Sequence, residues 1–206
     1  MKERPILFSG AMVRALLAGT KTQTRRVANK MVQHPDLGNL YTPGALVLEH
    51  EPHHVIDRSC PYGAPGDRLW VRESGWERPE RTPKMMREGA DTWAPYYYAA
   101  DGEDGDQLRE WGFKVRPSIH MPRWACRIVL EIVSVRVERL NDIRGNDCIA
   151  EGAWREEDKA LGRSSEAIKA FSTLWESING AGSWAANPWV WVIEFKRIES
   201  AAKEAA

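Results

Sequence analysis

The feature that most constrains the fold is a change of alternation inside the long apolar segment at residues 127–140. Its apolar residues first occupy every second position and then switch to the other set, in the order Ile128, Leu130, Ile132, Val133, Val135 and Val137. Successive side chains of a strand point to opposite faces, so an uninterrupted strand would turn half of these residues away from the core. A β-bulge inserts one extra residue and bends the strand, which removes the conflict. We therefore predict a long strand with a bulge or strong bend in its middle, a device that closes small barrels.

Three segments have the pattern of helices. The first covers residues 10–18, where Ser9 can cap its start and Gly19 sits where a left-handed C-terminal residue is expected. A second, short helix is predicted near residues 145–152. The third covers residues 165–179, and one face of it carries the apolar stripe Ile168, Phe171, Leu174, Trp175 and Ile178. Such a stripe indicates a helix that packs on the core.

Shorter strands are predicted between these elements, at residues 5–8, 22–27, 45–49, 55–56, 68–73, 92–99 and 189–197. Residues 28–44 and 77–92 mix polar residues with proline and glycine and are predicted to be loops. The pattern as a whole indicates an α+β fold with several strands, one of them long and bent. A length of 206 residues fits one domain with elaborated loops.

Residues 19–26, with the sequence GTKTQTRR, place one lysine, three threonine hydroxyls and two guanidiniums within eight positions. A charge run is usually a solvated surface turn, but the density of hydrogen-bonding groups makes a binding or catalytic site the alternative. Arg25 and Arg26 suit phosphate or carboxylate through their planar fork, and the pKa of Lys21 can fall when it is desolvated beside positive charge. A neutral Lys21 amine could take a proton from the Thr24 hydroxyl or from a water, as an activated nucleophile requires.

The spacing Gly19-x-Lys21-x-x-Thr24-x-Arg26 resembles the signature of the ASCH domain, a relative of the PUA family of small RNA-associated β-barrels. Further pieces follow in the order of that family, namely PGDRLWVRE at 65–73, CIAEG at 148–152 and NPWVWVIEF at 187–195. The pieces span nearly the whole chain. In length the chain resembles the longer ASCH proteins that phages and prophages often encode.

The resemblance implies a PUA-like, mainly antiparallel β-barrel of five to seven strands with flanking helices. One such domain would occupy residues 1–200, with loop insertions near 28–64 and 76–122 that the resemblance leaves unexplained. Residues 201–206 are expected to be a frayed tail.

The same resemblance implies a chemistry. Small bacterial ASCH proteins hydrolyse acetylcytidine, acetylated on its exocyclic amine, with a lysine, a threonine and a glutamate that match Lys21, Thr24 and Glu151 here. Thr24 would be the nucleophile or orient a water, Lys21 would be its base, and Glu151 would position Lys21 or carry the proton to the leaving amine. Arg26 would bind substrate or stabilise developing negative charge. No cofactor is implied.

A second hypothesis is that the same cleft binds RNA or a nucleotide without chemistry, as PUA-like domains commonly do. The residues for this role are Lys21, Arg25 and Arg26 at phosphate, and Trp70, Trp76 or Tyr97 stacked on a base. Glu73, at a strand end beside Trp76, either reads the edge of a base or forms an ion pair with a neighbouring basic residue such as Arg72. Glu73 is also the alternative to Glu151 as the acid that works with Lys21.

Charge and composition indicate a basic surface patch and the cellular compartment of the protein. The 29 basic and 29 acidic residues cancel, but residues 1–30 hold seven basic residues against one acidic residue, which predicts a positive patch around residues 19–26. Three scattered cysteines are too few for a disulfide framework and favour a reduced cytoplasm. The first residues lack the apolar run of a signal peptide, and no stretch reaches the roughly 20 apolar residues that span a bilayer. We expect a cytoplasmic protein without a membrane partner.

One metal motif has to be considered. Residues 50–54, HEPHH, match the H-E-x-x-H pattern of zinc metalloproteases. That motif needs both histidines on one face of a continuous helix, whereas Pro52 would break the helix and the flanking residues look strand-like. We therefore predict no zinc site here.

Overall fold

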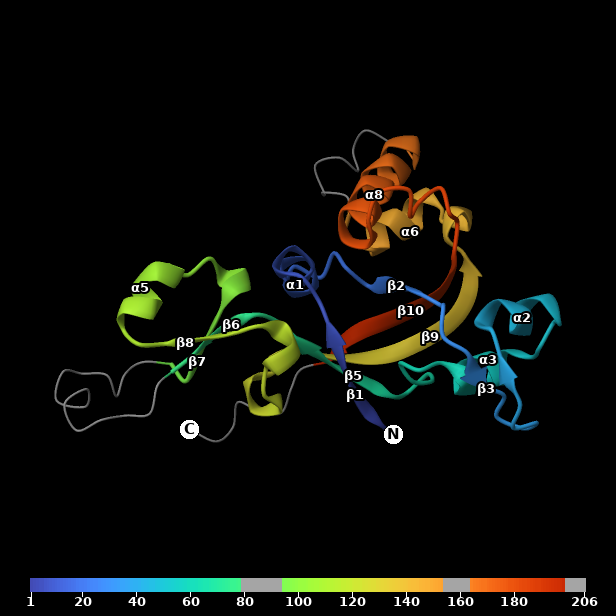
Figure 1. Cartoon of the computed structure of the whole chain (residues 1–206), viewed down its shortest axis with the longest axis horizontal. Helices are drawn as coiled ribbons and strands as arrows, with labels where there is room; N and C mark the ends of the chain where they lie inside the picture. Colours follow the sequence, from blue (N-terminus) through green and yellow to red (C-terminus); the bar gives the residue numbers. More distant parts are fainter. Residues whose placement is uncertain (79–93, 154–163, 199–206) are drawn as a thin grey trace.

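The computed structural model describes residues 1–78, 94–153 and 164–198 (Figure 1). Its centre is a five-stranded mixed sheet with the strand order β1-β5-β9-β10-β2. These strands are β1 (Glu3–Leu7), β2 (Gln23–Val27), β5 (Arg68–Arg72), β9 (Val129–Arg139) and β10 (Trp189–Ile198). β1 runs parallel to β5, and the other three pairings are antiparallel.

The predicted bulge is confirmed at Val133. On β10, Glu194 pairs with Ser134 and the next residue, Phe195, pairs with Ile132, so Val133 has no partner in the ladder. Val133 is 51% exposed. The extra residue lets the apolar positions on both sides of it face the same core, and β9 curves through a wide arc in Figure 1.

The predicted barrel is not closed among the described residues. β1 and β2 are the two edges of the sheet, and no backbone ladder joins them. What the structure has is a mixed sheet with helices packed on it. The side chain of Arg26 bridges the edges, because its Nη2 atom in β2 donates a 2.6 Å hydrogen bond to the carbonyl oxygen of Leu7 at the end of β1.

Helices cover both faces of the sheet. They are α1 (Gly10–Leu17), α2 (Pro43–Leu48), α3 (His53–Ser59), α6 (Gly145–Ala150) and α8 (Ser164–Asn179). A further helix, α5 (Gly105–Glu110), lies away from this sheet at one end of the molecule (Figure 1). α1, α2 and α3 contribute to the larger apolar core, together with residues of β1, β5, β9 and β10. α6 and α8 form a second core with Val190 and Val192. Because β10 is buried on both faces, its sequence is an almost continuous apolar run.

The predicted helices at 10–18, 145–152 and 165–179 are confirmed as α1, α6 and α8. The strands predicted at 45–49 and 55–56 are wrong, since these residues lie in α2 and α3. Short apolar runs do not distinguish strand from helix. At α2 the decision comes from its start, where Thr42 Oγ1 accepts a 3.3 Å hydrogen bond from the Ala45 N–H and Pro43 occupies the first turn.

The flanks of the HEPHH segment are therefore helical. The chain nevertheless breaks between them, since α2 ends at Leu48 and α3 begins at His53. His50 has a positive φ of 60°, so the residues of the motif do not lie on one continuous helix.

Two small sheets complete the fold. One pairs β3 (Val32–Gln33) with β4 (Leu40–Tyr41), inside the segment predicted to be a loop. The other has the order β7-β6-β8, formed by β6 (Gly75–Glu77), β7 (Tyr96–Tyr98) and β8 (Lys114–Arg116). Short 3-10 turns lie at Ala99–Asp101, Ser118–His120, Arg123–Ala125 and Leu140–Asp142. Most of the predicted 77–92 loop and the predicted tail lie outside the described residues. Among the residues that the structure describes, no helix has the length and apolarity to cross a membrane.

Candidate functional site

Lys21 lies just after the left-handed turn that ends α1, where Gly19 has a φ of 74°. Its side chain is only 2% exposed. The Nζ atom donates hydrogen bonds of 2.8 Å to the carbonyl oxygen of Gln23, 2.8 Å to the carbonyl oxygen of Glu151 and 2.9 Å to Oε2 of Glu151. All three N–H bonds of a protonated lysine are thereby used.

Glu151 comes to Lys21 from the end of α6, where it is the last residue before the left-handed Gly152, whose φ is 73°. A Cβ on Gly152 would stand 3.0 Å from the Cβ of Ala15 and 3.2 Å from the Cβ of Lys21. The glycine thus supplies both the turn and the close approach of α6 to α1. The Glu151 carboxylate is shared, with Oε2 on Lys21 and Oε1 3.2 Å from Nη1 of Arg25.

The electrostatics of Lys21 have two opposing parts. Burial lowers the pKa of its amine, and the nearby Glu151 carboxylate raises it. Burial is the larger effect, and the positive charges of Arg26 and Arg25 act in the same direction, so the pKa lies below the ordinary value for lysine. The Phe8 ring, with its centroid 5.5 Å from Nζ, forms part of the apolar surroundings.

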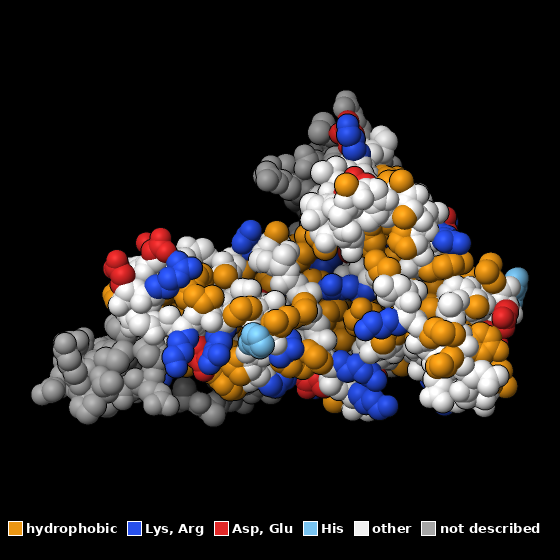
Figure 2. Space-filling model, viewed as in Figure 1, with side chains coloured by type: hydrophobic (Ala, Val, Ile, Leu, Met, Phe, Trp, Pro, Cys, Tyr) orange, Lys and Arg blue, Asp and Glu red, His pale blue; other side chains and the backbone are white. Residues whose placement is uncertain are grey.

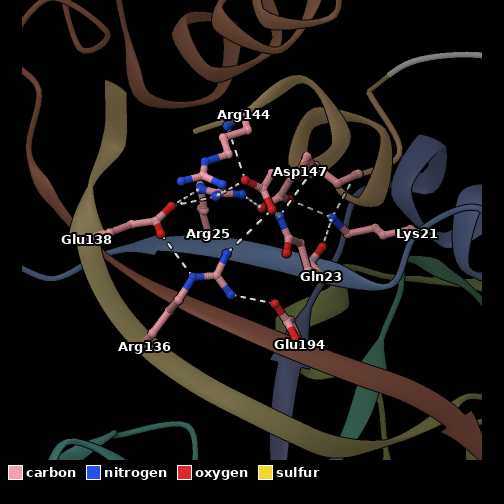
Figure 3. A network of polar contacts seen from close by, with 9 residues as sticks. Lys21, Gln23, Arg25, Arg136, Glu138, Arg144, Asp147 and Glu194 are labelled. Carbon is pink, nitrogen blue, oxygen red and sulfur yellow. Dashed lines mark hydrogen bonds and ion pairs between the residues drawn. The ribbon is translucent and has the colours of Figure 1, made fainter. Parts of the chain in front are cut away.

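Arg25 is fully buried and belongs to a network of charged side chains from β2, β9, β10 and α6 (Figure 3). Its Nη2 lies 2.5 Å from Oε1 of Glu138, and its Nε lies 3.1 Å from the same atom. Arg136 joins Glu138 to Glu194, as Figure 3 shows. Arg25 had been expected at substrate phosphate, yet its donors contact Glu138 and Glu151. These contacts indicate that Arg25 holds the Glu151 carboxylate in place.

The residues around Lys21 enclose a pocket of about 180 Å³. Its polar lining includes Lys21, Thr24, Arg26 and Glu151. Thr24 is buried, and its hydroxyl makes no hydrogen bond within the part of the chain that the structure describes. Burial lowers the pKa of Arg26, whose guanidinium lies 5.1 Å from the centre of the Phe8 ring. The hydroxyl of Thr24 is therefore available to a bound molecule or water.

The remaining predicted residues do not line this pocket. Glu73 is buried and forms a two-bond ion pair with Arg127, with Nε to Oε1 and Nη2 to Oε2 both at 2.9 Å. Burial raises the pKa of Glu73, and Arg127 opposes that rise. Of the two interpretations of Glu73, the structure shows the ion pair, and its partner is Arg127 and not Arg72. Glu151, by contrast, is within hydrogen-bond reach of Lys21.

The three aromatic candidates also have other neighbours. Trp76 packs on the start of α5, where a Cβ on Gly105 would stand 2.6 Å from its ring. Tyr97 makes an edge contact with Phe113, with the ring centroids 5.3 Å apart. Trp70 lies on β5 beneath the guanidinium of Arg72, which is 4.9 Å from the ring centre.

Sequence reasoning missed one wall of the pocket. Four apolar residues of α8 line it together with Asn179, namely Phe171, Leu174, Trp175 and Ile178. They were assigned to the core as a single stripe, and nothing in the helical spacing separates the core-facing members from those at a cavity. Reasoning also missed Glu138, because its role depends on the bulge that sets its face of β9.

Within the described ranges, no group of three or more His, Cys, Asp or Glu side chains is arranged to hold a metal ion. Comparison of the chain with protein-family models, with curated proteins and with solved structures found no match.

Proposed function

We propose that this protein is an ASCH-type amidohydrolase that removes an acyl group from the exocyclic amine of a nucleoside such as acetylcytidine. One observation carries the proposal. Lys21 and Glu151, 130 positions apart, meet at one pocket that Thr24 also lines, and the Thr24 hydroxyl has no hydrogen-bond partner among the described residues. In this proposal the curved sheet, bridged at its edges by Arg26, is an opened variant of the PUA-like barrel.

The proposed base is the neutral amine of Lys21. Its ammonium passes a proton to Oε2 of Glu151, 2.9 Å away, which leaves an amine beside a neutral carboxylic acid. The burial that lowers the pKa of Lys21 favours this state. The amine then accepts a proton from the Thr24 hydroxyl or from a water that Thr24 orients.

The oxygen nucleophile attacks the acyl carbon, and Arg26 stabilises the negative oxygen of the tetrahedral intermediate. Glu151 returns its proton to the exocyclic nitrogen as the carbon–nitrogen bond breaks, which regenerates the Lys21–Glu151 ion pair. With water as nucleophile the carboxylic acid leaves directly. With Thr24 as nucleophile an ester forms on Thr24, and a second step with water releases the acid.

The test is hydrolysis of acetylcytidine, followed by chromatography, for the wild type and for Lys21→Ala, Thr24→Ala and Glu151→Gln. Removal of a general acid or base typically costs about 10²–10⁴-fold in rate, so each variant should lose activity by this order. Glu73→Gln is the matched control, since Glu73 is an equally buried, ion-paired carboxylate outside the pocket. Activity that survives Glu151→Gln and disappears in Glu73→Gln would contradict the proposal. An intact-mass measurement during turnover distinguishes the two nucleophiles, because only Thr24 attack adds an acetyl group to the protein.

One observation favours a second function, nucleotide binding without chemistry. All three N–H bonds of Lys21 are engaged by protein acceptors, which is also what a purely structural ion pair requires. Arg26 would then bind a phosphate at the mouth of the pocket. Absence of turnover, combined with saturable binding of cytidine monophosphate that Arg26→Gln abolishes, would support this function.

A further inference from the structure

The outer face of β5 carries a group of side chains that the hydrolytic pocket does not use. Strand alternation sends Leu69 and Val71 to the core, and it sends Arg68, Trp70 and Arg72 to the opposite face. Figure 2 shows Lys and Arg side chains gathered over the part of this face where β1 and β5 run in Figure 1.

Among the described residues, neither Arg68 nor Arg72 forms an ion pair. Glu3 and Glu131 lie opposite Arg68 in the strand register, but they pair with Arg123 and Lys196, so this group of side chains keeps an excess of positive charge. The neighbouring arginines differ, since Arg4 pairs with Asp67 and Arg123 pairs with Glu3. Arg72 gives one N–H to the carbonyl oxygen of Met121, at 3.4 Å. Its guanidinium is held over the Trp70 ring, an arrangement that orients the planar fork for a phosphate oxygen.

An exposed aromatic ring lies beside these arginines. Trp124 follows Arg123, whose guanidinium also lies over the Trp70 ring, 5.6 Å from its centre. Trp124 is 58% exposed and contacts Tyr96 in a T-shaped arrangement, with centroids 6.2 Å apart. An exposed tryptophan on a surface with an excess of positive charge is the combination with which proteins hold a single strand, through stacking on a base and contacts to phosphates. We call Arg68, Trp70, Arg72, Arg123 and Trp124 the β5 arginine surface.

This surface is continuous with the pocket through Leu7. In the parallel pairing of β1 with β5, Leu7 lies opposite Arg72, so the two side chains share a face. Leu7 is 40% exposed and lines the pocket, and its carbonyl oxygen accepts the hydrogen bond from Arg26. A strand that lies on the β5 arginine surface therefore has a direct path to the pocket.

We infer that the β5 arginine surface binds single-stranded nucleic acid and presents one of its nucleotides to the pocket. The inference rests on the proposed function for the identity of the pocket, and it specifies the substrate as a nucleotide within a strand. Stacking on Trp124 needs an unpaired base, so a duplex is not the ligand. The phosphates and bases are common to RNA and to DNA, and the two are separated by experiment.

The experiment measures fluorescence anisotropy of labelled 12-nucleotide RNA, of DNA of the same sequence and of the corresponding duplexes, at several salt concentrations. The full chain should bind either or both single strands more tightly than the duplexes. The Arg68→Gln/Arg72→Gln double variant should bind more weakly. The slope of log affinity against log salt should fall by roughly 1.4, about 0.7 for each lost phosphate contact. Equal affinity for RNA and DNA would show that the surface recognises phosphates and bases alone. A preference for RNA would show that it also contacts the 2′-hydroxyl of the sugar.

Two further variants test the stacking contact. Trp124→Ala should weaken single-strand binding about tenfold, and Trp124→Phe, which keeps a stacking ring, should restore most of it. The matched control is Arg109→Gln on α5, which removes an exposed arginine whose partner is Asp106. No binding by the wild type, equal binding of duplex and single strand, or an equal loss in Arg109→Gln would overturn the inference.

Failure of this inference and failure of the proposed function give different results. Hydrolysis of free acetylcytidine without oligonucleotide binding removes only the inference. Single-strand binding that depends on Arg68 and Arg72, with no hydrolysis of any acylated substrate, removes only the proposed function. When both hold, the Arg68→Gln/Arg72→Gln variant lowers the ratio of kcat/KM on an acetylated oligonucleotide to kcat/KM on the free nucleoside, chiefly through KM.

Discussion

The side-chain nitrogen of Lys21 contacts Glu151 twice, at 2.8 Å from its backbone carbonyl oxygen and at 2.9 Å from its carboxylate oxygen Oε2. The first contact ties Lys21 to the end of α6, and the second pairs two buried charges. Neither depends on the catalytic proposal, so the pair can be examined by stability measurements alone.

We expect Lys21→Met and Glu151→Gln to be strongly non-additive. Removal of one member of a buried ion pair typically costs about 3–5 kcal/mol, because the other charge is left without its partner. The double variant leaves no such charge and should lose clearly less stability than the sum of the single variants. Urea unfolding followed by tryptophan fluorescence measures all four free energies of unfolding. Additive losses would show that the two groups do not interact.

The pH dependence of hydrolysis should report Lys21. In the proposed mechanism the Lys21–Glu151 pair holds one proton, which moves from Lys21 to Glu151, so kcat/KM should fall as the pH rises through the pKa at which Lys21 loses this proton in the folded protein. Because burial lowers that pKa, the alkaline limb should lie below lysine's ordinary value of 10.5. An alkaline limb centred at or above 10.5 would exclude this proton transfer from Lys21.

The same shift gives a stability test with a defined sign. Between the lowered folded pKa and 10.5, the unfolded chain holds a proton at Lys21 that the folded chain lacks. Stability therefore rises with pH across this window. The rise should be absent in Lys21→Met, when the free energy of unfolding is measured in urea at several pH values.

Arg25→Gln should destabilise the protein by about 3–5 kcal/mol, because it removes the fully buried cation that Glu138 and Glu151 share and leaves them only Arg136 and Lys21. It should also lower hydrolysis in the variant that remains folded, since Glu151 loses the contact to Oε1. Arg109→Gln, at an exposed i,i+3 ion pair, is the control and should change stability by less than about 1 kcal/mol. Equal effects of the two substitutions would show that Arg25 does not position the Glu151 carboxylate.

Deletion of Val133 should be far more damaging than Val133→Thr. The deletion removes the bulge and reverses the faces of one half of β9, which would turn Val135 and Val137 away from the core and Glu138 away from Arg25. A loss of several kcal/mol is expected, whereas Val133→Thr at an exposed position should stay within roughly 0.5 kcal/mol. Circular dichroism and urea unfolding compare the two, and a deletion variant as stable as the wild type would show that the strand tolerates either register.

The features that the sequence predicted correctly are those encoded in neighbouring residues. Gly19 marks the end of α1 because few other residues adopt its positive φ, and the alternation around Val133 encodes the bulge directly. The α2 segment was predicted wrongly because six residues are too short for periodicity to decide. Its Thr42 cap and Pro43 were the better signals.

Long-range relations were much harder to predict. That Glu151 meets Lys21 was suggested only by a family resemblance, since no local pattern specifies a contact across 130 positions. The carboxylate partners of Arg25 depend on how β2, β9 and α6 pack together, and the open edges of the sheet depend on pairings that alternation does not encode. The contribution of α8 to the pocket wall is another long-range relation that local sequence patterns do not encode.

The contact between Arg26 and the Leu7 carbonyl oxygen has an entropic consequence. A free arginine side chain loses about 2 kcal/mol of rotamer freedom when it is fixed. Here the hydrogen bond to Leu7 and the Phe8 ring restrict Arg26 in the unliganded protein. That loss occurs during folding, so an anion that enters the pocket meets a cation already oriented, and little of its binding energy is spent on ordering the side chain.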